Sequence, residues 1–199
     1  MPDLLIATRN PGKVREIAEV LAGMPARLLS LADFPNAPDV PEAGATFEEN
    51  ARAKALAIAR WSGQLTLADD SGLEIDALGG EPGVLSSRYA GPGASDPDRI
   101  AKVLRLMVRV PDEERTARFR CAAALAAPDG RLEVVEGVVE GRIAREPRGA
   151  GGFGYDPIFV PEGEARTMAE LAPGEKNRLS HRGRAFRALR PLIAAWLQL

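Results

Sequence analysis

A long β-hairpin in the middle of the chain places the strongest limit on its fold. Residues 116–126 (TARFRCAAALA) and 131–144 (RLEVVEGVVEGRIA) favour strands, and the tripeptide PDG between them is typical of a turn. A hairpin pairs its strands antiparallel, whereas the rest of the chain alternates strand and helix patterns. We therefore expect an α/β fold with a mixed sheet.

The remaining elements are predicted from hydrophobic periodicity and capping signals. Strands are expected over residues 3–7, 26–31, 64–68, 73–78 and 157–160. Helices are expected over residues 12–22, 46–61, 97–109 and 180–197, and Thr46 with Glu49 predicts a capping box at the second. Residues 33–45 and 79–97 are predicted loops. The sequence has no internal repeat and no low-complexity linker, so we expect one domain over residues 1–199.

Composition excludes several classes of protein. The net charge of -2 gives no global basic field to recruit nucleic acid or an anionic membrane. The single cysteine, Cys121, excludes an internal disulfide and suits a reducing cytoplasm. No apolar run approaches the roughly 20 residues of a membrane span. We expect a cytoplasmic protein without nucleic-acid or membrane partners.

The segment TRNPGK, residues 8–13, joins a predicted strand to a predicted helix. Such a loop presents backbone N–H groups and the positive end of the helix dipole, which suits a phosphate group. Gly12 permits close approach and Lys13 adds a charge, but the segment is not a Walker A loop because Val14 replaces the metal-binding Ser or Thr. An ordinary turn with helix-starting residues explains the segment equally well.

Polar residues also lie on faces that should be buried. Asn50 and Lys54 lie on the inward stripe of the predicted helix 46–61. They could hydrogen-bond the core or face a wet cleft, and a lysine that snorkels at the edge of the stripe is the alternative. Asp69 and Asp70, in ADDSG, should point to opposite sides if the strand continues through them. Asp70 with a loop carboxylate such as Glu42 could hold Mg²⁺, and the alternative is an acidic turn.

Two further segments combine unusual residues. In GGFGYDP (151–157), glycines flank Phe153. This ring could stack on a planar base, and a β-bulge with a buried phenylalanine is the alternative. In EKNRLSHR (175–182), Ser180 is a predicted N-cap, which puts His181 and Arg182 in the first helical turn against the helix dipole. Function can override such a local rule, and a solvated basic face is the alternative.

Lysine is rare in this chain. Of 26 basic residues only four are lysine, namely Lys13, Lys54, Lys102 and Lys176. A chain that otherwise uses arginine can keep lysine where a compact point charge is needed, although genomic base composition gives the same bias. Three of the four fall in the segments above.

Together the segments resemble the HAM1-like family of non-canonical purine nucleoside triphosphate pyrophosphatases. The resemblance runs from residue 5 to about residue 185 and rests on five motifs in the family's order. These are ATRNPGK, TFEENARAKA, ADDSGLEIDALGGEPGVLSSRYAG, GGFGYDPIF and EKNRLSHRGRA. It implies an elongated mixed α/β fold of two lobes with the site in the cleft between them, and a homodimer.

The resemblance also implies an activity and a set of site residues. The activity is Mg²⁺-dependent cleavage of ITP, dITP and XTP between the α- and β-phosphates, giving a nucleoside monophosphate and pyrophosphate. Glu42 and Asp70 would bind magnesium, and Asp70 would be the catalytic base. Substrate would be bound by Thr8, Arg9, Asn10, Pro11, Gly12, Lys13, Lys54, Ser71, Phe153, Gly154, Tyr155, Asp156, Lys176, His181 and Arg182. Arg9 falls at a variable position of its motif.

Two other functions compete with this one. A Maf-like pyrophosphatase acting on pyrimidine or modified nucleotides would share the broad architecture, but the paired GGFGYDP and SHR segments oppose it. A catalytically silent nucleotide-binding protein would need the acids to be lost, and Glu42, Asp69 and Asp70 are all present.

Overall fold

The hairpin lies within a curled six-stranded sheet, which the computed structural model describes together with the rest of residues 1–198. The strand order is β2-β1-β3-β4-β5-β6. The outer strand β2 and its neighbour β1 run parallel to each other, β1 is also parallel to β3, and the other pairs are antiparallel, so the predicted mixed sheet is confirmed. The strands are β1 (Asp3–Ile6), β2 (Arg27–Ser30), β3 (Leu65–Ile75), β4 (Thr116–Ala126), β5 (Leu132–Ile143) and β6 (Phe159–Pro161).

Five α-helices flank the sheet, and the four predicted from periodicity are all present. They are α1 (Pro11–Val20), α2 (Phe47–Ser62), α3 (Asp96–Leu106), α4 (Pro173–Leu179) and α5 (His181–Leu197). Thr46 caps α2 through Glu49 N–H as predicted, but the Glu49 carboxylate accepts from Ala45 N–H rather than closing the box on Thr46. The short helix α4 was not predicted, because it begins with Pro-Gly, a dipeptide typical of turns.

The segment ADDSG is part of a strand, and the predicted break between two extended pieces is wrong. Strand β3 runs without interruption from Leu65 to Ile75 and pairs with β4 over nearly this whole length. The turn signal of Ser-Gly is overridden by this pairing, and the two acids are tolerated in the strand because helices on either side provide partners for them.

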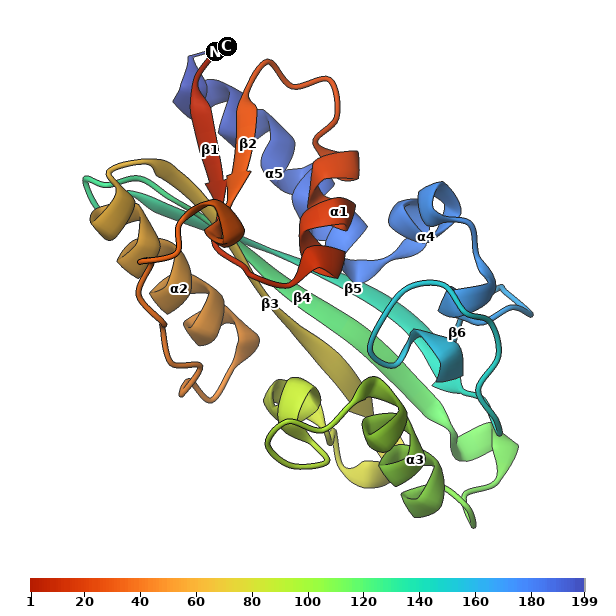
Figure 1. Cartoon of the computed structure of the whole chain (residues 1–199). Coiled ribbons are helices and arrows are strands. Elements are labelled where there is room, and N and C mark those ends of the chain that lie inside the picture. The colour runs from red at the N-terminus through yellow and green to blue at the C-terminus, as the bar shows by residue number, and fades with distance from the viewer. Residues whose placement is uncertain (199) are drawn as a thin grey trace.

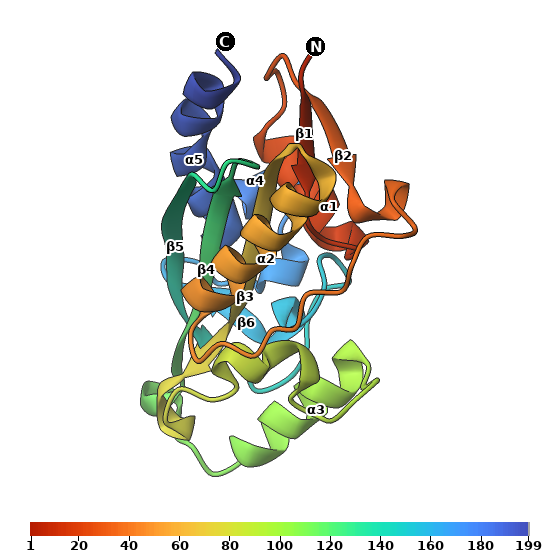
Figure 2. The ribbon, with the colours of Figure 1, turned by 90° about the vertical axis from the view of Figure 1, so that its left-hand side faces the viewer.

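Strands β3, β4 and β5 run through both lobes, and the helices divide between the two ends (Figure 1). Toward one end α2 covers one face of the sheet, while α1 and α5 cover the other; α3 lies at the opposite end (Figure 2). Each of these three regions has its own apolar core. Among residues 1–198 no helix is both long enough and apolar enough to cross a membrane.

Helix α5 lies very close to β5 at Gly137. A Cβ atom there would lie 2.1 Å from the carbonyl oxygen of His181 and 2.7 Å from the nitrogen of Ala185, both backbone atoms of α5. Glycine at this position therefore sets how near α5, and the site residues that begin it, lie to the sheet.

We predict that Gly137→Ala lowers the free energy of unfolding by about 1–3 kcal/mol, because the added methyl group forces α5 outward. Denaturant unfolding monitored by circular dichroism measures this. Gly174→Ala in α4 is the control, since its Cβ would meet only the Glu19 carboxylate, at 3.6 Å, and should change stability by less than about 1 kcal/mol. Equal stability of Gly137→Ala and the wild type would contradict the prediction.

Candidate active site

A cavity of about 570 Å³ lies where the two lobes meet. Its wall is built from the start of α1, the middle of α2 and β3, the 3₁₀ segment Gly83–Arg88, the start of α3, the loop around Phe153, and α4 with the start of α5. Fifteen of the predicted site residues line it, namely Thr8, Asn10, Pro11, Lys13, Glu42, Lys54, Asp70, Ser71, Phe153, Gly154, Tyr155, Asp156, Lys176, His181 and Arg182.

The start of α1 is shaped by the side chain of Asn10. This residue is the N-cap, and its Oδ1 accepts from Gly12 N–H at 2.8 Å and from Lys13 N–H at 3.2 Å. The N–H groups of Gly12 and Lys13, which were expected to face a phosphate, therefore already have an acceptor in Asn10. Gly12 itself lies against the Phe153 ring, since a Cβ would come within 2.6 Å of it. This contact joins the α1 loop to the aromatic loop.

Asp69 occupies the face of β3 that α1 and α5 cover, and it does not line the cavity. Its Oδ2 lies 3.0 Å from Lys13 Nζ and accepts from Arg182 NH2 at 3.0 Å. Burial alone would raise the pKa of Asp69, but Lys13, Arg182 and Lys54 outweigh burial and lower it. The carboxylate is thus ionised and holds two cationic side chains in place.

Asp70 occupies the opposite face of β3, as strand alternation predicts. Its Oδ2 accepts from Asn50 Nδ2 of α2 at 2.8 Å, which explains the polar residue on the inward stripe of that helix. Lys54, one turn further along α2, forms an ion pair with Glu42 and donates to the backbone oxygen of Asp69 at 3.1 Å. Burial and the nearby Glu42 carboxylate raise the pKa of Asp70.

Glu42 and Asp70 fit a divalent cation that is bound jointly with phosphate. Among residues 1–198 no group of three or more His, Cys, Asp or Glu side chains is arranged to hold a metal ion. Mg²⁺ does not need such a cage, because it keeps several waters and is held by one or two carboxylates plus substrate phosphates. Two carboxylates in one cavity, close enough for Glu42 to raise the pKa of Asp70, provide that donor set.

Glu16 of α1 is a site residue that the sequence did not reveal. Its two oxygens accept from Lys176 Nζ at 2.5 Å and from Arg182 NH1 at 2.6 Å. Burial alone would raise the pKa of Glu16, but Arg182 and Lys176 outweigh burial and lower it. Lys176 also forms an ion pair with Asp156. The two cations are therefore fixed by a chain of alternating charges from Asp69 to Asp156.

The aromatic loop is held by the same charges. Asp156 Oδ2 accepts from Phe153 N–H at 2.8 Å, and burial raises the pKa of Asp156. The Phe153 ring centroid lies 4.9 Å from Lys176 Nζ and 5.5 Å from the Arg182 guanidinium carbon. Tyr155 donates its hydroxyl to the backbone oxygen of Ser86 at 2.8 Å, so its ring is fixed in the wall.

His181 is stacked on Phe119, with ring centroids 4.7 Å apart and planes 12° apart. Burial, Arg182 and Lys176 lower the pKa of His181 well below its usual value, so the imidazole is neutral at neutral pH. Its Nδ1 is buried and has no hydrogen-bond partner among residues 1–198. A neutral imidazole offers one donor and one acceptor, which suits recognition of a polar heterocycle.

Two predicted substrate-binding residues do not line the cavity. Gly12 is covered by the Phe153 ring, and Arg9 turns toward the loop 34–45, where it pairs with Asp39 at 2.6 Å and donates to the Ala37 oxygen at 2.9 Å. The structure adds other lining residues that the sequence did not suggest: Gly72, Val84, Ser86, Ser87, Asp96, Arg99 and Phe119. Gly72, Val84, Ser86 and Ser87 lie within the motif ADDSGLEIDALGGEPGVLSSRYAG but were given no role there. Asp96, Arg99 and Phe119 lie outside the five motifs, and folding brings them to the cavity.

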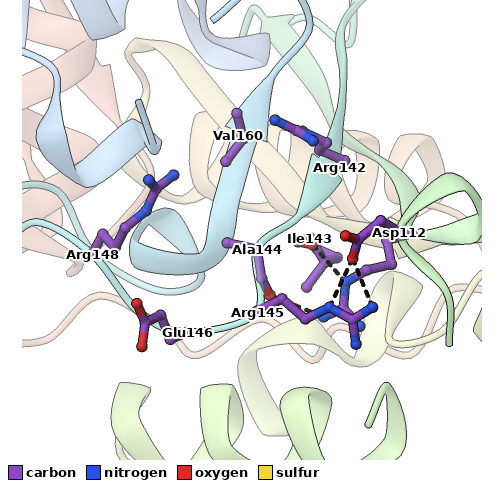
Figure 3. A pocket seen from close by; sticks show the side chains of 9 residues that line it. Asp112, Arg142, Ile143, Ala144, Arg145, Glu146, Arg148 and Val160 are labelled. Atoms are coloured by element: carbon purple, nitrogen blue, oxygen red, sulfur yellow. Dashed lines mark hydrogen bonds and ion pairs between the residues drawn. The ribbon is translucent and has the colours of Figure 1, made fainter. Parts of the chain in front are cut away.

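A second hollow, of about 230 Å³, lies beside β5 and β6 and is lined by arginines (Figure 3). Arg115 there is buried and donates to backbone oxygens, including those of Ile143 and Ala144. Arg145 pairs with Asp112 at 2.7 Å. Both arginines therefore have partners within the chain and need no ligand to account for their positions. We place the functional site in the larger cavity.

Fold and cavity together define a two-lobed mixed α/β protein whose interlobe site combines a carboxylate side with an aromatic, cationic side. The model of the Ham1 family matches residues 4–192, and the chain belongs to that family.

Named relatives agree over nearly the full length. The chain is 54% identical to the dITP/XTP pyrophosphatase of Geobacillus kaustophilus over 95% of this chain and 93% of that protein. It is also 54% identical to the dITP/XTP pyrophosphatase of Geobacter sulfurreducens, covering 96% of each. A solved HAM1 protein from Coxiella burnetii superposes with a TM-score of 0.88 at 45% identity, over 98% of this chain and all of that one.

We predict that Glu16→Gln lowers the free energy of unfolding by about 3 kcal/mol, because two buried cations lose the anion between them. Thermal or denaturant unfolding at pH 7 measures the loss. Glu48→Gln is the matched control: Glu48 pairs with Arg52 on the exposed face of α2 and should contribute less than about 1 kcal/mol. A loss for Glu16→Gln no larger than for Glu48→Gln would show that the charge chain does not stabilise the fold.

Acid should also weaken the wild type more steeply than Glu16→Gln. The pKa of Glu16 is lowered in the folded chain, so near pH 4 the unfolded state binds a proton that the folded state does not. Stability from this group is therefore complete above its unfolded pKa of about 4.3 and is lost as pH falls through the lower folded pKa. Unfolding free energies measured from pH 6 to pH 2.5 test this, and identical slopes in the two proteins would refute it.

Proposed function

We propose that this protein hydrolyses non-canonical purine nucleoside triphosphates (ITP, dITP and XTP) to the nucleoside monophosphate and pyrophosphate, with Mg²⁺ as cofactor. One observation carries the proposal: a single cavity joins the carboxylate and lysine side formed by Glu42, Lys54 and Asp70 to the aromatic and cationic side around Phe153. The names of the relatives, dITP/XTP pyrophosphatase, support the same substrates.

Lys13 and Lys54 would hold the triphosphate. Both ammonium groups lie close to carboxylates, Lys13 at Asp69 and Lys54 at Glu42, so their positions are set before substrate arrives. On this side of the cavity, the charge of the phosphates would be neutralised by these lysines, the positive end of α1 and a cation. Thr8 and Asn10 shape the start of α1 and line the cavity, so they would lie beside the phosphates of a bound nucleotide.

Glu42 and Asp70 would hold the Mg²⁺ ion. When bound, the ion supplies a Lewis acid for the phosphate oxygens and lowers the pKa of a bound water. Lys54 now pairs with Glu42, so we expect this lysine to exchange its carboxylate partner for phosphate when nucleotide and ion bind.

Asp70 would accept the proton of the attacking water. Its side chain faces the cavity, and Asn50 fixes its rotamer by donating to Oδ2. Burial and Glu42 raise its pKa toward the range in which a carboxylate accepts a proton more readily. Asp69, on the far face of β3, would position Lys13 and Arg182 without touching the reacting atoms.

The other side of the cavity would select the base. Phe153 offers a ring for stacking, while Lys176, His181 and Arg182 offer donors. The 6-keto group of hypoxanthine and xanthine accepts a hydrogen bond, whereas the 6-amino group of adenine would leave these donors without a partner. Ser71, bonded to Arg182 NH2 at 2.7 Å, links this recognition side to the strand that carries Asp70.

A homodimer and a cytoplasmic location stay predictions. A pyrimidine or modified nucleotide, the substrate class of a Maf-like enzyme, is the competing choice, and the donor set around Phe153 favours a purine with a 6-keto group.

We expect ITP, dITP and XTP, each with Mg²⁺, to release pyrophosphate at least about 100-fold faster in kcat/KM than ATP. Ion-exchange analysis of the products, with pyrophosphate and orthophosphate measured separately, tests substrate and bond together. Chelation with EDTA should stop the reaction and added Mg²⁺ should restore it. Orthophosphate as the first product would exclude the proposed bond, and equal rates on ATP and ITP would exclude the proposed selectivity.

Asp70→Asn should lower kcat by about 10²–10⁴-fold while nucleotide binding stays within a few-fold, because the amide keeps the shape but cannot take a proton. Steady-state kinetics and equilibrium binding of ITP measure the two effects. Asp129→Asn, an exposed change in the β4–β5 turn, is the control with unchanged kcat. Near-normal turnover of Asp70→Asn would remove Asp70 from the role of base.

A further inference from the structure

Asp96, the first residue of α3, reaches across the cavity to the aromatic loop. Its Oδ2 accepts from Gly154 N–H at 2.7 Å, although the two residues are 58 positions apart in the chain. Its other oxygen forms an ion pair with Arg99. Both Asp96 and Arg99 line the cavity, and neither belongs to the residues expected to bind substrate or metal.

The capping of α3 does not require Asp96. Ser95 is the N-cap, and Asp98 completes a capping box by accepting from Ser95 N–H at 2.9 Å and from its hydroxyl at 2.6 Å. The helix start therefore has its own acceptor in Asp98. Asp96 is left to bond a loop from a distant part of the chain, which helix stability alone does not explain.

Arg99 fixes the orientation of Asp96. Its NH1 donates to the backbone oxygens of Ser87 and Ala94, each at 2.7 Å, and its NH2 pairs with the Asp96 carboxylate. The guanidinium is largely buried, with its side chain 17% exposed. A carboxylate held in this way has few alternative positions, so its bond to Gly154 is defined in direction as well as in distance.

Two carboxylates thus hold the aromatic loop, because they accept from two consecutive backbone N–H groups. Asp156 accepts from Phe153 N–H at 2.8 Å, and Asp96 accepts from Gly154 N–H. Gly154 has φ +64°, a left-handed conformation that is only one of those open to glycine, so the bond to Asp96 restricts a residue with wide backbone freedom. One of these N–H groups belongs to Phe153 and the other to the next residue, Gly154. The two bonds therefore hold the backbone on both sides of the Phe153 Cα and set the direction in which the ring projects.

We infer that Asp96, oriented by Arg99, is a positioning residue that sets the Phe153 ring for stacking on the base of the nucleotide. The inference rests on the proposed function for its kinetic consequence. Its structural part, the restraint of Gly154, holds for the free protein and is measured separately.

The first experiment measures amide hydrogen exchange in the free protein. Asp96→Ala should speed exchange at Gly154 by at least about 10-fold, because the N–H loses its acceptor. Asp98→Ala is the matched control: it removes the exposed capping acid two residues further along α3, which bonds Ser95, and should leave exchange at Gly154 unchanged. Unchanged exchange in Asp96→Ala, or equal acceleration by Asp98→Ala, would overturn the inference.

The second experiment separates KM from kcat with ITP. Asp96→Ala should raise KM about 10-fold and change kcat less than about 3-fold, since stacking is lost but the phosphate chemistry is retained. Asp96→Asn keeps an oxygen for Gly154 N–H and should restore KM to within about 3-fold of the wild type. If Asp96 acted only through its charge at the start of α3, the uncharged asparagine would not restore KM.

A double-mutant cycle with Phe153→Ala completes the test. If Asp96 acts through the ring, Asp96→Ala should add less than about 2-fold to the KM of Phe153→Ala. Full additivity would overturn the inference. A wild type that does not cleave ITP would instead refute the proposed function, and the exchange at Gly154 would still decide whether Asp96 restrains the loop.

Discussion

The ion pairs of Asp69 are the interaction on which the rest of the site depends. A carboxylate buried in the middle of β3 is tolerable only because Lys13 comes to it from α1 and Arg182 from α5. The same pairs dock both helices on one face of the sheet. They also leave the neighbouring Asp70 free on the other face, where Asn50 and Glu42 share its surroundings. Two adjacent acids therefore have separate surroundings: Asp69 is buried among cations, and Asp70 lines the cavity.

Local patterns predicted the framework well. The hairpin, the mixed sheet, the helix capped by Thr46 and the Ser180 cap of α5 follow from short-range signals that no distant contact opposed. Strand alternation likewise predicted that Asp69 and Asp70 face opposite sides. The predictions failed at two places. ADDSG has the composition of a turn, but its pairing with the distant strand β4 keeps it extended. Helix α4 was missed because it starts with residues typical of a turn.

The residues missed at the site share a physical cause. Glu16 pairs with Lys176 and Arg182, which are 160 and 166 positions away, and Asp96 bonds a loop 58 positions away. Helical periodicity makes both of them look like ordinary exposed acids of their helices. Arg9 is the opposite case: the resemblance implies a contact with substrate, whereas in this structure the side chain bonds Asp39 and Ala37 in a neighbouring loop. Long-range partners cannot be inferred from one sequence.

The uninterrupted course of β3 has a consequence for how this chain can change in length. Since side chains alternate along a strand, inserting or deleting one residue between Leu65 and Asp69 would exchange the faces of the two acids. A deletion would put Asp70 between Lys13 and Arg182 and leave Ser71 facing the cavity. An insertion would put Asp69 in the cavity and leave the two cations facing Ala68. A one-residue shift within the strand would therefore change the surroundings of both acids at once, which a substitution at one position does not do. We therefore expect changes of length to be tolerated only in the loops outside β3.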